Sequence, residues 1–218
     1  VKIYFLGTGT SQGIPVIGSH HSVCLSSDKK DNRLRVSVWI YDENYSFVID
    51  CGPDFRQQML TSGCTKLDAI LFTHEHADHI RGITVIAKKY RLPVYITNLT
   101  LSRSGLNLDS DLVRTFSAHQ SVNIGDLVIT PFPKLHDASE PHSFTIKCNG
   151  FTVGVFTDIG FQCLFGVQNL CLALLPDKNN PMPKWLTLLD APFAPRTVIN
   201  VNFPAIEAEA VQGIRVVR

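Results

Sequence analysis

Residues 73–80 of this 218-residue chain read T-H-E-H-A-D-H-I, and this run constrains both the fold and the chemistry. Three of the eight histidines of the chain fall within residues 74–79, together with an aspartate. The run ends the apolar stretch 69–73, A-I-L-F-T, which is typical of a short buried strand. Histidine and carboxylate side chains are ligands that zinc, manganese and iron accept in proteins. A strand that leads into this run therefore predicts a metal site.

The spacing within the run has a geometric meaning. Side chains alternate along an extended chain, so His74 and His76 are expected to project to the same side. Where the chain turns into a helix that begins near Ile80, Asp78 and His79 can reach the same cavity from another side. One short segment can thus supply ligands to two adjacent metal ions. The alternative interpretation is a polar loop that happens to be rich in histidine.

Short apolar runs bounded by turn residues dominate the first three quarters of the chain. We expect strands at residues 1–6, 36–41, 46–50, 69–73 and 93–97, and a second set at 122–124, 127–132, 143–148 and 151–156. Helices are expected at residues 55–61 and 82–90. Asn149-Gly150 is typical of a tight hairpin turn between the last two strands. Two sets of strands, with helices between and after them, predict stacked sheets flanked by helices.

The composition is that of an ordinary globular protein, with 44% hydrophobic and 18% charged residues. No apolar run approaches the roughly 20 residues that a membrane-spanning helix needs, and residues 1–10 lack the pattern of a secretion signal. A formal net charge of +1 gives no support to a strongly basic nucleic-acid-binding surface, although a local basic patch could exist. The six cysteines form no CxxC pair and are expected to be reduced thiols. These features predict a cytoplasmic protein without a membrane partner.

Around the histidine run, the chain resembles the metallo-β-lactamase superfamily of hydrolases. The segments GTGTSQGIPVIG (7–18) and VIDCGPDFRQQML (48–60) look like its cyclic-phosphodiesterase branch. The segments LDAILFTHEHADHIRGI (67–83) and FPKLHDASEP (132–141) are similar to exonuclease-like members. The likeness covers about residues 1–160. It implies an α/β fold, a four-layered αβ/βα sandwich with metal ions at one edge of the facing sheets.

The resemblance also implies how two divalent metal ions, zinc or manganese, would be held. The ligands of the first ion would be His74, His76 and His136. Those of the second would be Asp78, His79 and Asp158, with Asp158 bridging the two ions. Asp158 follows the apolar run 151–156, and a carboxylate at a strand end can reach a cavity. The alternative for Asp158 is an ordinary turn aspartate.

Three residues are candidates for the catalytic steps, namely Asp78, Asp158 and His142. Either aspartate could accept the proton of the attacking water, and His142 could protonate the leaving group. The H-D-A context favours His136 over His142 as a metal ligand, and a solvated loop histidine is the other interpretation of His142. Asp50 would orient a ligand histidine and fix its tautomer, or it is only a turn aspartate. The GTGTS loop could offer N–H groups to a phosphate, but a tight turn also needs its glycines.

The chain departs from the family pattern in two places. In the cyclic-phosphodiesterase branch, the first loop carries a Cys-x-Cys-x-x-Cys set for a structural zinc ion. Here the stretch from Ser19 to Cys24 reads S-H-H-S-V-C, so an intact structural zinc site is not expected. The superfamily also supplies a late histidine to the second metal ion, whereas no histidine follows His142 in this chain. Asp177 and Asp190 are the candidates to replace it.

Residues 161–218 do not resemble this family. Residues 191–218 resemble instead the closing segment of SurE-type nucleotidases, which are also metal-dependent phosphatases. The paired aspartates at the start of that family are absent here, so no catalytic residue is carried over from it. We therefore expect a hydrolase core at residues 1–160 and an atypical segment at 161–218, packed on the same domain.

The leading hypothesis is a metal-dependent hydrolase that cleaves a cyclic or other small phosphodiester. A metal-bound hydroxide would attack, because a bound cation lowers the pKa of water towards neutrality. Three alternatives stay open: a single-strand nuclease, a thioester or lactam hydrolase of the same fold, and a metal-binding scaffold with an impaired second site. The expected partner is a small phosphodiester substrate, with nucleic acid and a homodimer as further candidates.

Overall fold

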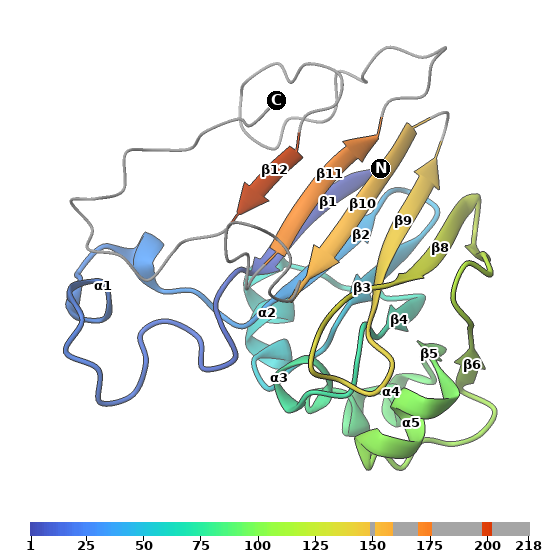
Figure 1. Cartoon of the computed structure of the whole chain (residues 1–218), viewed down its shortest axis with the longest axis horizontal. Coiled ribbons are helices and arrows are strands. Elements are labelled where there is room, and N and C mark those ends of the chain that lie inside the picture. Colours follow the sequence, from blue (N-terminus) through green and yellow to red (C-terminus); the bar gives the residue numbers. More distant parts are fainter. Residues whose placement is uncertain (149–150, 159–169, 176–197, 202–218) are drawn as a thin grey trace.

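The computed structural model describes residues 1–148, 151–158, 170–175 and 198–201. Two six-stranded sheets stack face to face, and helices pack on the outer face of the first sheet (Figure 1). This arrangement confirms the predicted α/β sandwich. In the described ranges the helices cover the first sheet only, and the fourth layer of the sandwich stays a prediction.

The first sheet is mixed. Its strands are, in order, β1 (Lys2–Gly7), β2 (Ser37–Tyr41), β3 (Ser46–Ile49), β4 (Ala69–Leu71), β5 (Val94–Ile96) and β6 (Val113–Thr115). The first three strands pair antiparallel, and β3 to β6 pair parallel. Parallel neighbours require a crossover connection. The crossovers contain α2 (Phe55–Ser62), α3 (Ala77–Ile80), α4 (Thr84–Tyr90) and α5 (Asn98–Ser104).

The second sheet is antiparallel throughout. Its strands are β7 (Val122–Ile124), β8 (Leu127–Pro133), β9 (His142–Cys148), β10 (Phe151–Thr157), β11 (Leu170–Leu175) and β12 (Val198–Val201). Cys148 pairs with Phe151, as expected for a tight β9–β10 hairpin, although Asn149 and Gly150 themselves lie outside the described residues. Strands β11 and β12 come from residues 161–218 and extend this sheet. The boundary at residue 160 stays a prediction.

Alternating side chains along the strands of the first sheet produce two separate cores. Val38, Ile40 and Phe47 are buried between the two sheets, against partners such as Ile129 and Phe144. The intervening residues face the helices: the sheet contributes Trp39, Val48, Ile70 and Val94, and the helices and their termini contribute Phe55, Ile80, Ile83 and Ala87. Each fully buried side chain of this size contributes about 1.5–3 kcal/mol of transfer free energy. The first sheet is thus held from both faces, and its strand ends are rigid supports.

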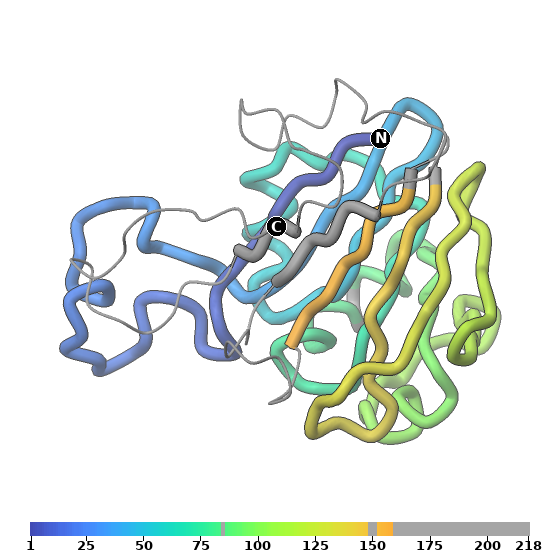
Figure 2. Tube along the Cα trace, turned by 45° about the horizontal axis from the view of Figure 1, so that its top comes forward, coloured from blue at the N-terminus to red at the C-terminus, as the bar shows by residue number. Residues whose placement is uncertain are grey.

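A long excursion between β1 and β2 extends away from the sandwich (Figure 2). It contains α1 (Ser22–Leu25) and the 3₁₀ turn η1 (Lys29–Asp31). At its base the N–H of Gly9 donates to the carbonyl oxygen of Leu34, 2.8 Å away, and a Cβ on Gly7 would lie 2.0 Å from the carbonyl oxygen of Arg35. The glycines of the GTGTS loop therefore permit close backbone approach, and the geometry favours the turn interpretation over a phosphate-binding loop.

The predicted strands and helices agree with the structure to within two residues at most ends. Several elements differ. Helix α3 begins at Ala77, three residues before the expected start near Ile80, while α1, η1, α5, β6, β11 and β12 were not expected. Strand β6 is a three-residue edge strand, V-R-T, with two exposed side chains, so it has no hydrophobic periodicity to detect. No helix in the described part of the chain is long and apolar enough to cross a membrane.

Candidate metal centre

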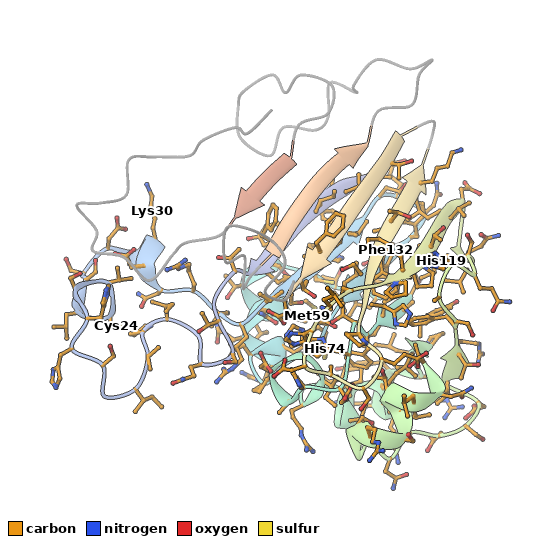
Figure 3. The ribbon with its side chains drawn as sticks, in the orientation of Figure 1. Cys24, Lys30, Met59, His74, His119 and Phe132 are labelled. Carbon is orange, nitrogen blue, oxygen red and sulfur yellow. The ribbon has the colours of Figure 1, made fainter. Side chains whose placement is uncertain are left out.

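The predicted site residues gather where strands of both sheets end. Asp50 follows β3, the histidine run follows β4, His136 follows β8, and Asp158 follows β10. Figure 3 shows His74 at this edge, beneath the ends of the strands. Each of these strands runs towards the same edge, so residues far apart in the sequence meet there.

Three imidazole rings form the first ligand group, His74, His76 and His136. The Nε2 atom of His136 lies 3.2 Å from Nε2 of His74 and 3.1 Å from Nδ1 of His76. Nitrogen ligands of a tetrahedral zinc ion, each about 2.0–2.1 Å from the metal, are about 3.3 Å apart. The group therefore has the spacing of a metal-binding set.

The other nitrogen of each ring has a partner outside the group. Nε2 of His76 lies 3.2 Å from the carbonyl oxygen of Asp137, and Nδ1 of His136 lies 3.1 Å from the carboxylate of Asp137. Nδ1 of His74 lies 2.8 Å from Oγ1 of Thr73. These oxygens accept the ring protons, so the three inward nitrogens face one another with lone pairs. Burial also lowers the pKa values of His74 and His136, which keeps both rings neutral. Three converging lone pairs fit a bound cation.

The second ligand group comprises His74, His79 and Asp158. Oδ2 of Asp158 lies 2.5 Å from Nε2 of His79 and 3.9 Å from Nε2 of His74, so this carboxylate stands between the two groups. Asp78 lies beside it, with Oδ2 3.4 Å from Nε2 of His79. The structure thus places Asp158 where a bridging ligand would lie.

The pKa of His79 is shifted in the opposite direction from those of His74 and His136. Burial lowers its pKa, but Asp50, Asp158 and Asp78 more than offset this and hold the pKa well above its ordinary value. As a metal ligand, His79 would have to give up the proton that it shares with Asp158. The second group is therefore compatible with a cation, but it is already partly neutralised by a proton.

Asp50 connects the two groups. It is fully buried, has a φ of 63°, and accepts hydrogen bonds from N–H of Thr73 (2.9 Å), Oγ1 of Thr73 (2.8 Å) and Nδ1 of His79 (2.7 Å). Because Thr73 Oγ1 donates to Asp50, it accepts from His74. One carboxylate thus orients a histidine of each group. These contacts agree with the orienting role that the sequence left open for Asp50.

Two glycines allow α3 to pack against the segment after β3. A Cβ on Gly52 would lie 1.8 Å from the carbonyl oxygen of Asp78, and one on Gly82 would lie 2.1 Å from the carbonyl oxygen of Gly52. The N–H of Cys51 also donates to the carbonyl oxygen of His79 at 2.6 Å. This close backbone approach, open only to glycine, brings Asp78 and His79 to the site.

His142 belongs to neither ligand group. Its side chain is buried, with the residue 1% exposed; Nδ1 lies 2.9 Å from the carbonyl oxygen of Glu140, and the ring meets Phe116 edge-on at 5.5 Å. The interpretation as a solvated loop histidine is wrong. The preference for His136 as the ligand agrees with the geometry, and the role of His142 as a general acid stays a prediction.

Two residues near the site carried no prediction from the sequence, Glu75 and Lys134. Oε1 of Glu75 accepts from the N–H of Ser139 at 2.7 Å and thereby anchors the loop that follows His136. Burial raises the pKa of Glu75, but the hydrogen bonds from Ser139 more than offset this and lower it. Burial lowers the pKa of Lys134 to about 8, against the opposing effect of the nearby carboxylates. Their partners are distant in the sequence, so no local signal could have identified them.

In the first loop, Cys24 and His21 take part in local hydrogen bonds, and the lack of a structural zinc site there stays a prediction. Sγ of Cys24 accepts from the N–H of Val16 at 3.4 Å, and Nδ1 of His21 accepts from the N–H of Val23 at 3.3 Å. Among the described residues, neither side chain belongs to a group of three ligands. Cys24, Cys51 and Cys64 are free thiols. Asp177, Asp190 and residues 202–218 lie outside the described residues.

Comparisons with known proteins show which proteins this chain is similar to. Over 155 residues the chain is 33% identical to the exodeoxyribonuclease YycJ of Bacillus anthracis, covering 66% of this chain and 56% of that protein. The crystal structure of a diphosphatase from the PhnP family superimposes with a TM-score of 0.58 and 33% identity, covering 66% of this chain and 61% of that chain. The chain therefore spans little more than half the length of these two proteins.

The predicted likeness to SurE-type nucleotidases is confirmed over a short stretch. Thirty residues are 73% identical to the 5′-nucleotidase SurE of Rhizorhabdus wittichii, or 14% of this chain and 12% of that protein. A far longer match is to the beta-lactamase superfamily domain, over residues 45–168. Since that match contains the histidine run and covers more than half of the chain, the chain belongs to the beta-lactamase superfamily.

Proposed function

We propose that this chain is a metal-dependent hydrolase that cleaves a cyclic or other small phosphodiester at the strand-end site. The observation that carries the proposal is the convergence of three inward, unprotonated imidazole nitrogens beside the carboxylate of Asp158. Neutral lone pairs at this spacing repel one another unless a cation lies between them. Such a set is expected where a metal ion is held.

The first ligand group, together with the carboxylates of Asp78 and Asp158 beside His79, supports the following assignment. His74, His76 and His136 would hold one zinc or manganese ion, and Asp78, His79 and Asp158 a second. When bound, these ions would supply Lewis acidity and a lowered pKa of water. Asp50 and Thr73 keep the ring protons of His79 and His74 on the outward nitrogens.

Asp78 and Asp158 are the candidate proton acceptors. Their side chains are 20% and 17% exposed, so both reach solvent at the site. Burial raises the pKa of Asp78, but the hydrogen bond and charge of His79 more than offset this, and the carboxylate is ionised at neutral pH. An ionised carboxylate that faces solvent can take a proton from an attacking water.

The names of two relatives favour a phosphate substrate over a thioester or lactam. Two relatives that are 33% identical to the chain, each over 66% of its length, are named an exodeoxyribonuclease and a diphosphatase. The net charge of +1 favours a small substrate over extended contacts with a nucleic acid backbone. A single-strand nuclease is the second candidate, carried by the likeness to YycJ. The cytoplasmic location and the homodimer stay predictions.

Elemental analysis and a substrate panel test the proposal together. The purified chain should contain two metal ions and hydrolyse bis-p-nitrophenyl phosphate or a cyclic nucleotide faster than single-stranded DNA, a thioester or a chromogenic lactam. His76→Ala should remove most of the metal and most of the turnover. His20→Ala, which replaces an exposed histidine outside the site, is the matched control and should change neither. One metal ion or none, with no turnover on any substrate, would support the impaired scaffold instead.

A further inference from the structure

Lys134 links two strand ends that deliver different ligands. It follows β8, and its Nζ donates to the carbonyl oxygen of Thr157 at 2.5 Å and to Oγ1 of Thr157 at 3.1 Å. Thr157 ends β10, and β9 lies between β8 and β10 in the sheet. The lysine side chain therefore spans the strand that separates them.

The two ends of this link are adjacent to the metal centre. Lys134 precedes His136 by two residues, and Thr157 directly precedes Asp158. Asp158 has a φ of 44°, in the left-handed region that a non-glycine residue seldom adopts. The carbonyl group that Lys134 holds belongs to the peptide bond that enters Asp158. Fixing this carbonyl fixes the peptide plane, and with it the direction in which the Asp158 carboxylate leaves the strand.

The charges around Lys134 agree with a role in directing the Asp158 carboxylate. Asp158, Asp50 and Asp78 all lie close enough to stabilise the ammonium group of Lys134. Lys134 makes its two hydrogen bonds to Thr157, and the carboxylate of Asp158 contacts His79 instead. The lysine thus acts on Asp158 through the backbone and leaves the carboxylate oxygens to the ligand groups.

We propose that Lys134 is a positioning residue of the metal centre, which holds Asp158 between His74 and His79 by tying Thr157 to the end of β8. This inference rests on the proposed function, because the direction of Asp158 has a chemical consequence only where that carboxylate binds metal. A lysine that merely stabilised the fold would affect both ligand groups alike. A positioning residue affects the metal ion that depends on Asp158.

Zinc titration of the metal-free protein against a chromophoric chelator separates these roles. Four variants are compared with the wild type: Lys134→Met, Lys134→Arg, Asp158→Asn and the double variant Lys134→Met/Asp158→Asn. The loss of a residue that orients a metal ligand typically weakens metal binding by about 10–100-fold. Asp158→Asn should weaken most the binding of the second ion, because Oδ2 of Asp158 lies 2.5 Å from Nε2 of His79 and 3.9 Å from Nε2 of His74. Lys134→Met should weaken this same step by about tenfold and change the other step less than about threefold. Lys134→Arg, which keeps the charged donor, should restore part of the loss.

The double variant shows most directly whether Lys134 acts through Asp158. If Lys134 acts through Asp158, the double variant should bind zinc no more weakly than Asp158→Asn alone, because the two effects are not additive. Additive losses, equal weakening of both steps, or wild-type affinities in Lys134→Met would overturn the inference while leaving the proposed function intact. A wild-type chain that binds no zinc would overturn both.

If circular dichroism shows that Lys134→Met does not fold, a substitution at Thr157 tests the inference instead. Thr157→Val removes the Oγ1 acceptor and keeps the carbonyl. Because one hydrogen bond contributes about 0.5–1.5 kcal/mol, the Asp158-dependent step should weaken by about threefold. Unchanged affinity in Thr157→Val would then count against the role of Lys134.

Discussion

The two ligand groups differ in how the protein balances their charge. His74, His76 and His136 present lone pairs to one another, and each ring passes its proton outward to an acceptor. His79, in contrast, is held between the carboxylates of Asp50 and Asp158 and retains a raised pKa. The first group is thus arranged for a cation in advance. The second must exchange a proton for the metal ion.

This difference predicts that the two groups bind their metal ions with different affinities. The group built from neutral imidazoles should bind its metal ion more tightly, because no proton competes for the inward nitrogens. The group built around His79 and the carboxylates should bind more weakly and depend more on the residues that orient it. Variants at His136, Asp50, Thr73 and Glu75 test this asymmetry, and the zinc affinity of each of the two binding steps is the common measure.

The largest effect is expected from His136→Ala. This histidine is the contribution of the second sheet to the first group, and its removal leaves two ligands from one short segment. The tighter binding step should weaken by more than about 100-fold, because even the partners that only orient ligands contribute 10–100-fold. The chelator competition described above measures it, with His20→Ala as the control. Loss confined to the weaker step would reverse the assignment of the two groups.

A smaller but more informative effect is expected from a pair of variants, Asp50→Asn and Thr73→Val. Asp50 orients a histidine of each group, so Asp50→Asn should weaken both steps by about tenfold or more. Thr73 Oγ1 reaches only His74 among the histidines, and Thr73→Val should act mainly on the tighter step. Matched zinc titrations of the two proteins provide the test. Identical zinc affinities of Asp50→Asn and Thr73→Val at both steps would contradict the inference that Asp50 orients one histidine in each group.

The smallest effect is expected from Glu75→Gln. The amide keeps an oxygen that can accept from the N–H of Ser139, but it removes the charge that strengthens this hydrogen bond. The loop that carries His136 should loosen slightly, and the tighter step should weaken by about threefold, corresponding to a loss of about 0.7 kcal/mol. An isothermal titration with zinc resolves a change of this size. A larger effect on the weaker step than on the tighter one would contradict the proposed role of Glu75.

Much of the fold followed from local patterns. The alternation in residues 36–41 and 46–50, the apolar run 69–73 and the Asn149-Gly150 signal each predict an element within a few residues, because secondary structure depends on nearby side chains. Elements for which no pattern was recognised were missed, namely α1, η1, α5, β6, β11 and β12. In the site, the spacing of His74 and His76 predicts that they share a side, and both contact His136.

The sequence by itself determined the metal-ligand run, its position after a buried strand and the class of chemistry that these residues serve. The family resemblance also named His136, Asp158 and Asp50. Only the tertiary structure showed that they meet at the run, that Asp50 contacts both Thr73 and His79, and that Lys134 links two strand ends. The physical reason is that contacts across stacked sheets depend on strand order and register. These are properties of the whole packed core, and no stretch of residues around the run encodes them locally.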